Sequence, residues 1–251
     1  VALVTADNKA ALSPLIAILE AVLAIAMTVV KWAMFLAPFA VFGLFAELVA
    51  TTGIGTLLGL AAYMAVVTLG LFALYAGYLV VAAALGSISL FAFARAVAPV
   101  QLLAFSTSSS AAVMPLSMET AIKELAVPPS IAGVVIPLGA TMNMAGTALY
   151  QAAAISFLAQ ISGIGLGLGE IALIIVTLTA TSIGAPAAPG ASVVILSSVA
   201  GGFGIPTAGL ALVLGVDRLL DMARTAVNVT GDLVACRLLK DVGGKQEPSA
   251  Q

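Results

Sequence analysis

Charged residues are missing from two long stretches of this chain, and this pattern constrains its fold more than any other feature. No Asp, Glu, Lys or Arg occurs between Glu47 and Arg95, and Glu170 is the only charge between Glu124 and Asp217. About 20 apolar residues suffice to cross a bilayer as one helix. Only 8% of the residues are charged, against roughly 25% in soluble domains. We therefore predict an all-α polytopic membrane protein in contact with the lipid bilayer.

Several function classes are excluded by the absence of particular residue types. The chain has no histidine, which removes serine–histidine catalysis, histidine metal sites and histidine proton shuttles. Cys236 is the single cysteine, so neither an intramolecular disulfide nor a cysteine-cluster metal site can form. The net charge of -2 gives no reason to expect a nucleic-acid partner.

The apolar stretches predict a series of membrane elements separated by breaks. Pro38 interrupts the first stretch, and the segment Asn143-Met144-Ala145-Gly146-Thr147 interrupts another. The chain begins with Val1 and lacks a basic leader, so we expect a piece of a longer protein. The predicted elements are a long apolar stretch over 12–50, a plain span over 56–85, a broken span over 128–160, a last helix over 207–238 and a polar tail over 241–251.

Two further apolar segments are interrupted by polar or helix-breaking centres. Residues 88–123 surround Ser106–Ser110, and residues 168–206 surround a centre at 182–190 with two prolines and two glycines. Each arm of the first segment is expected to be too short to cross a bilayer alone. Such tips must lie in protein or water, so both segments are predicted to be re-entrant hairpins. Interrupted segments in corresponding positions are typical of transporters with an inverted repeat.

The last helix carries the charged chemistry on one face. Its polar residues are spaced by 4, 3, 4 and 4 positions, which places them within an arc of about 80° on a helix. Charged groups at membrane depth cost roughly 2.5–3.5 kcal/mol each, so a row of them indicates pairing inside the protein or a binding site. The residues of this polar stripe are Asp217, Asp221, Arg224, Asn228 and Asp232.

The side chains of the stripe suggest individual roles. Arg224 has the fork geometry to hold a carboxylate, and Asp221, one turn away, could take an ammonium group. Together they could hold the two ends of an acidic amino acid. Asn228 and Asp232 offer hard oxygen ligands to a small cation such as sodium. A proton carried by Asp217 or Asp232 is the alternative coupling ion.

Four motifs resemble the glutamate transporter family, also called dicarboxylate/amino acid:cation symporters. They are Ser108-Ser109-Ser110, the stretch from Pro137 to Gln151, Ser182-Ile183-Gly184 with Pro189-Gly190, and the run from Asp221 to Asp232. The resemblance covers roughly residues 12–240 and corresponds to the family's C-terminal portion. It implies a scaffold-type helix region over 1–52, a transport domain over 53–240 with hairpins 88–123 and 168–206, and the tail 241–251.

The resemblance also implies a function and a set of site residues. A secondary active symporter in the plasma or inner membrane would move glutamate or aspartate with sodium, by an elevator movement within a homotrimer. Substrate contacts are implied at Ser109, Ser110, Met144, Thr147, Ala188, Asp221, Arg224, Thr225 and Asn228. One sodium would use Gly139, Asn143, Asn228 and Asp232, and another Thr141, Ser182, Ile183 and Ala185.

Departures from the family's pattern and other classes of function leave alternatives open. Ala145 stands where the family usually has an acid, which predicts fewer coupled sodium ions, and Ala185 replaces a usual threonine. A dicarboxylate or proton-coupled symporter, a passive channel, and an inactive fragment or paralogue are alternatives. An intramembrane aspartyl enzyme is disfavoured because Asp217, Asp221 and Asp232 share one helix, so we expect no enzyme.

Overall fold

A computed structural model of the chain describes residues 55–183, 191–206 and 209–241, together with scattered positions between 13 and 50. In these ranges the regular elements are helices and no strand occurs, so the all-helical prediction is confirmed. Most of the region predicted over 1–52, and residues 242–251 of the tail, lie outside the described residues. The helices are α3 (Gly55–Leu85), α4 (Leu90–Thr107), α5 (Ser110–Lys123), α6 (Pro129–Met142), α7 (Ala145–Ile161), α8 (Leu168–Ser182), α9 (Ala191–Gly202) and α10 (Leu210–Leu239).

Three described stretches are long and apolar enough to cross a membrane: Leu58–Leu85, Leu90–Thr107 and Pro129–Ile161. The first agrees with the predicted plain span. The second corrects the expectation that each arm of the first hairpin is too short, because α4 reaches 18 residues. Ser106 and Thr107 both donate their hydroxyls to the carbonyl of Leu103. These polar residues therefore continue the helix instead of ending it.

The break between α4 and α5 falls at two serines. Ser108 has a left-handed backbone conformation with φ of 52°, and Ser109 then caps α5 by accepting the backbone N–H of Ala112 at 3.3 Å. A serine hydroxyl is a favoured N-cap because it satisfies a free N–H of the first turn. The predicted interruption near Ser106–Ser110 thus lies at Ser108 and Ser109.

A second break separates α6 from α7 at Asn143 and Met144, within the interrupted segment predicted from the sequence. The Asn143 N–H still donates to the Gly139 carbonyl, but the chain then leaves helical geometry for two residues. The predicted second hairpin corresponds to α8 and α9, and residues 184–190 of its predicted centre at 182–190 lie outside the described residues.

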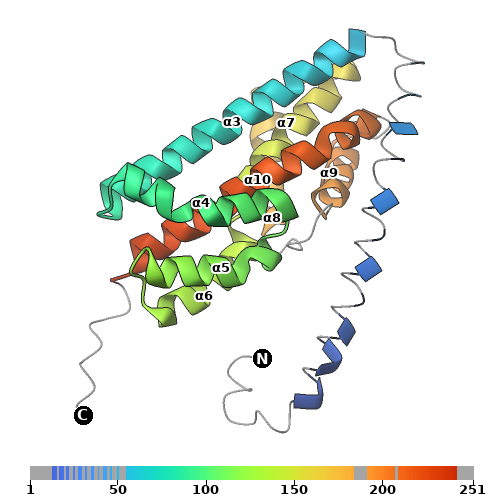
Figure 1. Ribbon diagram of the computed structural model, residues 1–251. Helices are drawn as coiled ribbons and strands as arrows, with labels where there is room; N and C mark the ends of the chain where they lie inside the picture. Colours follow the sequence, from blue (N-terminus) through green and yellow to red (C-terminus); the bar gives the residue numbers. More distant parts are fainter. Residues whose placement is uncertain are drawn as a thin grey trace, which may run out of the picture.

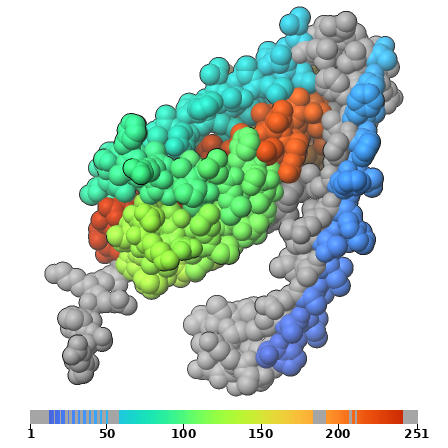
Figure 2. All heavy atoms as spheres, viewed as in Figure 1, coloured from blue at the N-terminus to red at the C-terminus, as the bar shows by residue number. Residues whose placement is uncertain are grey.

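Helix α10 lies at the centre of the described bundle, with α3 and α7 along it and α4, α5 and α6 crossing it (Figure 1). In the space-filling view α3 to α6 cover much of α10, which emerges mainly toward its two ends (Figure 2). Two apolar cores meet on this helix. One includes Leu212 and Val227 with residues of α3 and α7 to α9, and the other includes Val229 and Leu233 with residues of α4 to α6. Polar groups on α10 are therefore enclosed by protein on several sides.

Candidate functional site

The polar stripe predicted on the last helix is buried along its whole length. Arg224 is 3% exposed and Asp232 is 2% exposed. Asp217, Asp221 and Asn228 are buried as well, whereas Arg218, which the spacing places off the stripe, is exposed. Because these groups are buried against helices from both cores, the stripe is not a solvated helix face.

Arg224 is held by two carboxylates of its own helix. Its Nε and Nη2 donate to Asp221 Oδ1 at 3.0 and 2.8 Å, and its Nη1 lies 3.7 Å from Asp217 Oδ1. Among the described residues, Arg224 Nη1 makes no hydrogen bond. One guanidinium therefore faces two acids, which leaves this end of the stripe with an excess of negative charge.

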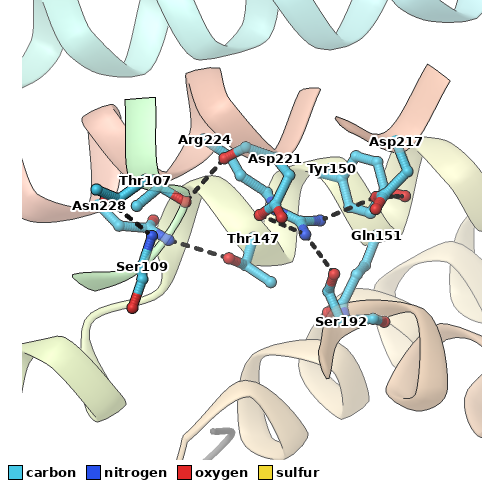
Figure 3. Close-up of polar contacts among 11 residues, drawn as sticks. Thr107, Ser109, Thr147, Tyr150, Gln151, Ser192, Asp217, Asp221, Arg224 and Asn228 are labelled. Carbon is cyan, nitrogen blue, oxygen red and sulfur yellow. Dashed lines mark hydrogen bonds and ion pairs between the residues drawn. The ribbon is translucent and has the colours of Figure 1, made fainter. Parts of the chain in front are cut away.

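Tyr150 of α7 completes this cluster, and sequence reasoning gave it no role. Its hydroxyl donates to Asp217 Oδ1 at 2.6 Å, and the guanidinium carbon of Arg224 lies 4.3 Å from its ring centroid. Figure 3 shows the tyrosine between the two charged residues. A cation over an aromatic face is attracted by the ring. The only hint in the sequence was that Tyr150 lies directly before Gln151, within the stretch from Pro137 to Gln151 that carries the family resemblance.

Gln151 connects the cluster to both arms of the second interrupted segment. Its Nε2 donates to the carbonyl of Ser192 in α9 at 2.9 Å, and its Oε1 accepts the hydroxyl of Ser182 in α8 at 3.3 Å. The Ser192 hydroxyl in turn accepts a hydrogen bond from Arg224 Nη2. Gln151 and Ser192 were not predicted as site residues, because their roles depend on contacts between distant segments.

Asn228 is bound by the first turn of α7. Its Nδ2 donates to Thr147 Oγ1 at 3.0 Å, and its Oδ1 accepts the backbone N–H of Gly146 at 2.8 Å. The structure thus brings together Thr147 and Asn228, both predicted as substrate contacts. Thr225, also predicted, donates its hydroxyl to the carbonyl of Asp221 at 2.8 Å and so bonds within α10.

The remaining predicted substrate contacts are placed at helix starts. Ser109 and Ser110 are buried at the beginning of α5, and Met144 is half-buried directly before α7. Figure 3 places Ser109 on the same side of α10 as Asn228 and Thr147. Ala188 lies outside the described residues.

Asp232 forms a second polar centre further along α10. Asn143 Nδ2 donates to its Oδ1 at 3.0 Å. A Cβ built on Gly139 would lie 2.7 Å from Asp232 Cγ, so the carboxylate packs directly on the backbone of α6. Within the described part of the chain, no ion pair reaches Asp232. Of the first predicted sodium set, Gly139, Asn143 and Asp232 therefore lie together around this carboxylate. The fourth member, Asn228, lies one turn before Asp232 and turns its side-chain oxygen to the Gly146 N–H.

The second predicted sodium set is only partly described. Thr141 donates its hydroxyl to the carbonyl of Leu138 at 3.1 Å, Ser182 bonds Gln151, and Ile183 is exposed. Ala185 lies outside the described residues. No group of three or more acidic, cysteine or histidine side chains that could hold a metal occurs in the described ranges.

The fold and the site define a helical membrane protein with a buried ionic helix at its centre. The chain belongs to the sodium:dicarboxylate symporter family, whose model matches residues 1–241. It is 38% identical over 236 residues to the proton/sodium-glutamate symport protein of Bacillus subtilis, covering 94% of this chain and 55% of that protein. It is 36% identical over 222 residues to the proton/glutamate-aspartate symporter of Escherichia coli, covering 88% of this chain and 51% of that protein.

A human relative extends the comparison. Excitatory amino acid transporter 3 is 40% identical over 156 residues, covering 62% of this chain and 30% of that protein. The chain thus spans about half the length of the two bacterial relatives. Membership of this family confirms the resemblance seen in the motifs, and the family and these relatives are symporters, not enzymes.

Proposed function

We propose that this chain forms the substrate-carrying part of a secondary active symporter for acidic amino acids, coupled to sodium. The observation that carries the proposal is the buried pair of Arg224 and Asp221, joined at 2.8 Å and placed on a helix in the middle of an apolar bundle. A buried ion pair is weak evidence for stability, because desolvation offsets much of its attraction. Its presence here is better explained by ligand binding.

An acidic amino acid offers an opposite charge to each member of this pair. Its ammonium group matches Asp221, and one of its carboxylates matches the planar fork of Arg224. Binding would exchange one internal ion pair for two pairs with the ligand, so neither buried charge loses its partner. Ser109, Ser110, Met144, Thr147, Ala188, Thr225 and Asn228 would complete the substrate site.

Sodium as the coupling ion is supported by the surroundings of Asp232. The buried Asp232 carboxylate packs on the backbone of Gly139 and has no cationic partner among the described residues, so it offers oxygen to a hard cation. The amides of Asn143 and Asn228 cannot carry protons. The second set, Thr141, Ser182, Ile183 and Ala185, would hold another ion. Proton coupling through Asp217 or Asp232 is the second candidate, and both ions appear in the name of the Bacillus subtilis relative.

Domain roles and movement follow from the same proposal. Residues 53–240 would form the moving transport domain, with 88–123 and 168–206 as re-entrant hairpins of an inverted repeat and the second hairpin as the gate. The region 1–52 would belong to the static scaffold. In the transporter, the transport domain of each protomer of a homotrimer would carry substrate across the plasma or inner membrane by an elevator movement.

Uptake of labelled aspartate and glutamate into proteoliposomes tests the function, with sodium and proton gradients imposed separately. Uptake driven by an inward sodium gradient at equal pH supports the proposal. Uptake that ignores sodium and follows the proton gradient replaces sodium by the proton. Absence of uptake under both gradients contradicts symport of acidic amino acids.

Competition with succinate separates an amino acid from a simple dicarboxylate as substrate. Asp221 lies one turn from Arg224 and would repel a second carboxylate that lacks an ammonium group. We expect unlabelled aspartate to block uptake far better than succinate. Equal inhibition by succinate would favour the dicarboxylate symporter instead.

A further inference from the structure

Tyr78 of α3 reaches the polar centre around Asp232. A Cβ built on Gly231 would lie 2.7 Å from Tyr78 Oη and 2.6 Å from Asn143 Nδ2. Both polar atoms therefore converge on the same spot beside α10, one residue before Asp232. Because glycine has no side chain, the hydroxyl and the amide can both approach the helix backbone there.

The amide of Asn143 has a fixed orientation as long as no cation is bound. Its Nδ2 donates to Asp232 Oδ1 at 3.0 Å. An ionised carboxylate only accepts hydrogen bonds, so the NH₂ end of the amide must face it. A hard cation is bound by oxygen and repelled by N–H groups. When a cation sits at Asp232, the Asn143 side chain can contribute only by turning its oxygen inward and moving its NH₂ away.

This turn puts Oδ1 about where Nδ2 now lies, near the Tyr78 hydroxyl. An amide oxygen has two lone pairs, so it can bind a cation and accept a hydrogen bond from that hydroxyl. We propose that Tyr78 is a positioning residue for cation binding: its hydroxyl donates to the Asn143 amide oxygen when this oxygen turns toward the cation at Asp232. This inference rests on the proposed function, because it assumes that sodium binds beside Asp232.

Sodium-induced stabilisation of the purified protein in detergent tests this role without measuring transport. Thermal unfolding is followed at increasing sodium chloride, with choline chloride keeping the ionic strength constant. Tyr78→Phe removes only the hydroxyl and keeps the ring. Tyr75→Phe is the matched control, because Tyr75 lies on the same helix but lines an apolar groove with Leu71 and Phe72. Sodium dependence of aspartate binding is measured in parallel.

We expect Tyr78→Phe to unfold at the wild-type temperature in choline but to need about fivefold more sodium for the same stabilisation, the effect of one neutral hydrogen bond. Tyr75→Phe should match the wild type. In an Asn143→Ala background, Tyr78→Phe should cause no further loss of sodium affinity. This last result separates action through the amide from a general packing effect.

Three outcomes would overturn the inference. If Tyr78→Phe responds to sodium like the wild type, the hydroxyl has no role in cation binding while the proposed function stands. If Tyr78→Phe weakens sodium binding equally with and without Asn143, the hydroxyl acts independently of the amide. If the wild-type protein itself shows no sodium response, both sodium coupling and the role of Tyr78 are wrong.

Discussion

The guanidinium of Arg224 lies 4.3 Å from the ring centroid of Tyr150, and the hydroxyl of the same tyrosine donates to Asp217. One side chain of α7 therefore fixes both a cation through its ring face and an anion through its hydroxyl. Since Asp217 and Arg224 are two turns apart on α10, Tyr150 spans the ionic cluster and holds it against α7. The position of Arg224 is thus set by α7 as well as by its own helix.

Replacement of Arg224 by alanine is expected to abolish high-affinity binding of aspartate and glutamate. Hydrogen bonds to a charged group contribute about 1.5–3 kcal/mol each, so affinity should fall at least tenfold to a hundredfold. Binding of small neutral amino acids could then exceed that of aspartate. Arg218→Ala is the control, because Arg218 is exposed on the same helix. Unchanged affinity for aspartate in Arg224→Ala, measured by calorimetry, would refute the assignment.

Gly139→Ala should disturb the centre around Asp232. The added methyl group would lie 2.7 Å from Asp232 Cγ, a contact too short to be tolerated without moving the carboxylate. We expect a large loss of sodium-dependent stabilisation, measured as the shift in unfolding temperature between choline and sodium. Gly133→Ala on the same helix meets nothing within 4 Å and should behave like the wild type. Equal sodium responses in both variants would argue against a cation at Asp232.

Gln151→Leu should weaken substrate binding although Gln151 does not belong to the charged stripe. The change removes the bond to the Ser192 carbonyl and the acceptor of the Ser182 hydroxyl, so Ser192 loses its fixed position beside Arg224. We expect aspartate affinity to fall about tenfold, the equivalent of one or two lost hydrogen bonds. Gln160→Leu, at an exposed position of α7, is the control. If both variants bind aspartate equally well, Ser192 does not require this support.

Arg237→Ala should destabilise the fold more than it changes the site. This buried guanidinium donates to the carbonyls of Gly86, Ser87 and Leu125, at 2.7, 3.1 and 2.6 Å. Its loss leaves carbonyls after α3 and after α5 without their donor, which is expected to cost about 3 kcal/mol. A drop in unfolding temperature with little change in aspartate affinity is the expected result. Arg95→Ala, at an exposed position of α4, should cause no comparable drop.

Local patterns predicted the helical class and the two described breaks, at Ser108–Ser109 and at Asn143–Met144. The spacing of the stripe predicted one buried polar face of α10, because helical periodicity depends only on neighbouring residues. The interruption after Met142 was predicted from polar and glycine residues within an apolar run. The length of α4 was underestimated, because Ser106 and Thr107 donate their hydroxyls to the carbonyl of Leu103 and so remain part of the helix.

The partners of the stripe could not be predicted in the same way. The sequence suggested that Asp221 binds the ammonium group and Arg224 a carboxylate of a ligand. In the structure the two side chains instead bind each other at 2.8 Å. Spacing by three residues places both on one helix face, so the internal pair forms when no ligand competes. Contacts of Gln151 and Ser192 depend on packing between helices, which no local pattern encodes.

The central position of α10 has a consequence for the proposed substrate and cation sites. Arg224 and Asp232 are eight residues apart on one continuous helix, so about 12 Å of rigid backbone separates them. An α-helix cannot change this spacing without breaking its hydrogen bonds. Besides the helix itself, the non-helical residues Asn143 and Met144 provide a second connection between the two centres. There, one short stretch of chain brings Asn143 to Asp232 and, within the next turn, Thr147 to Asn228.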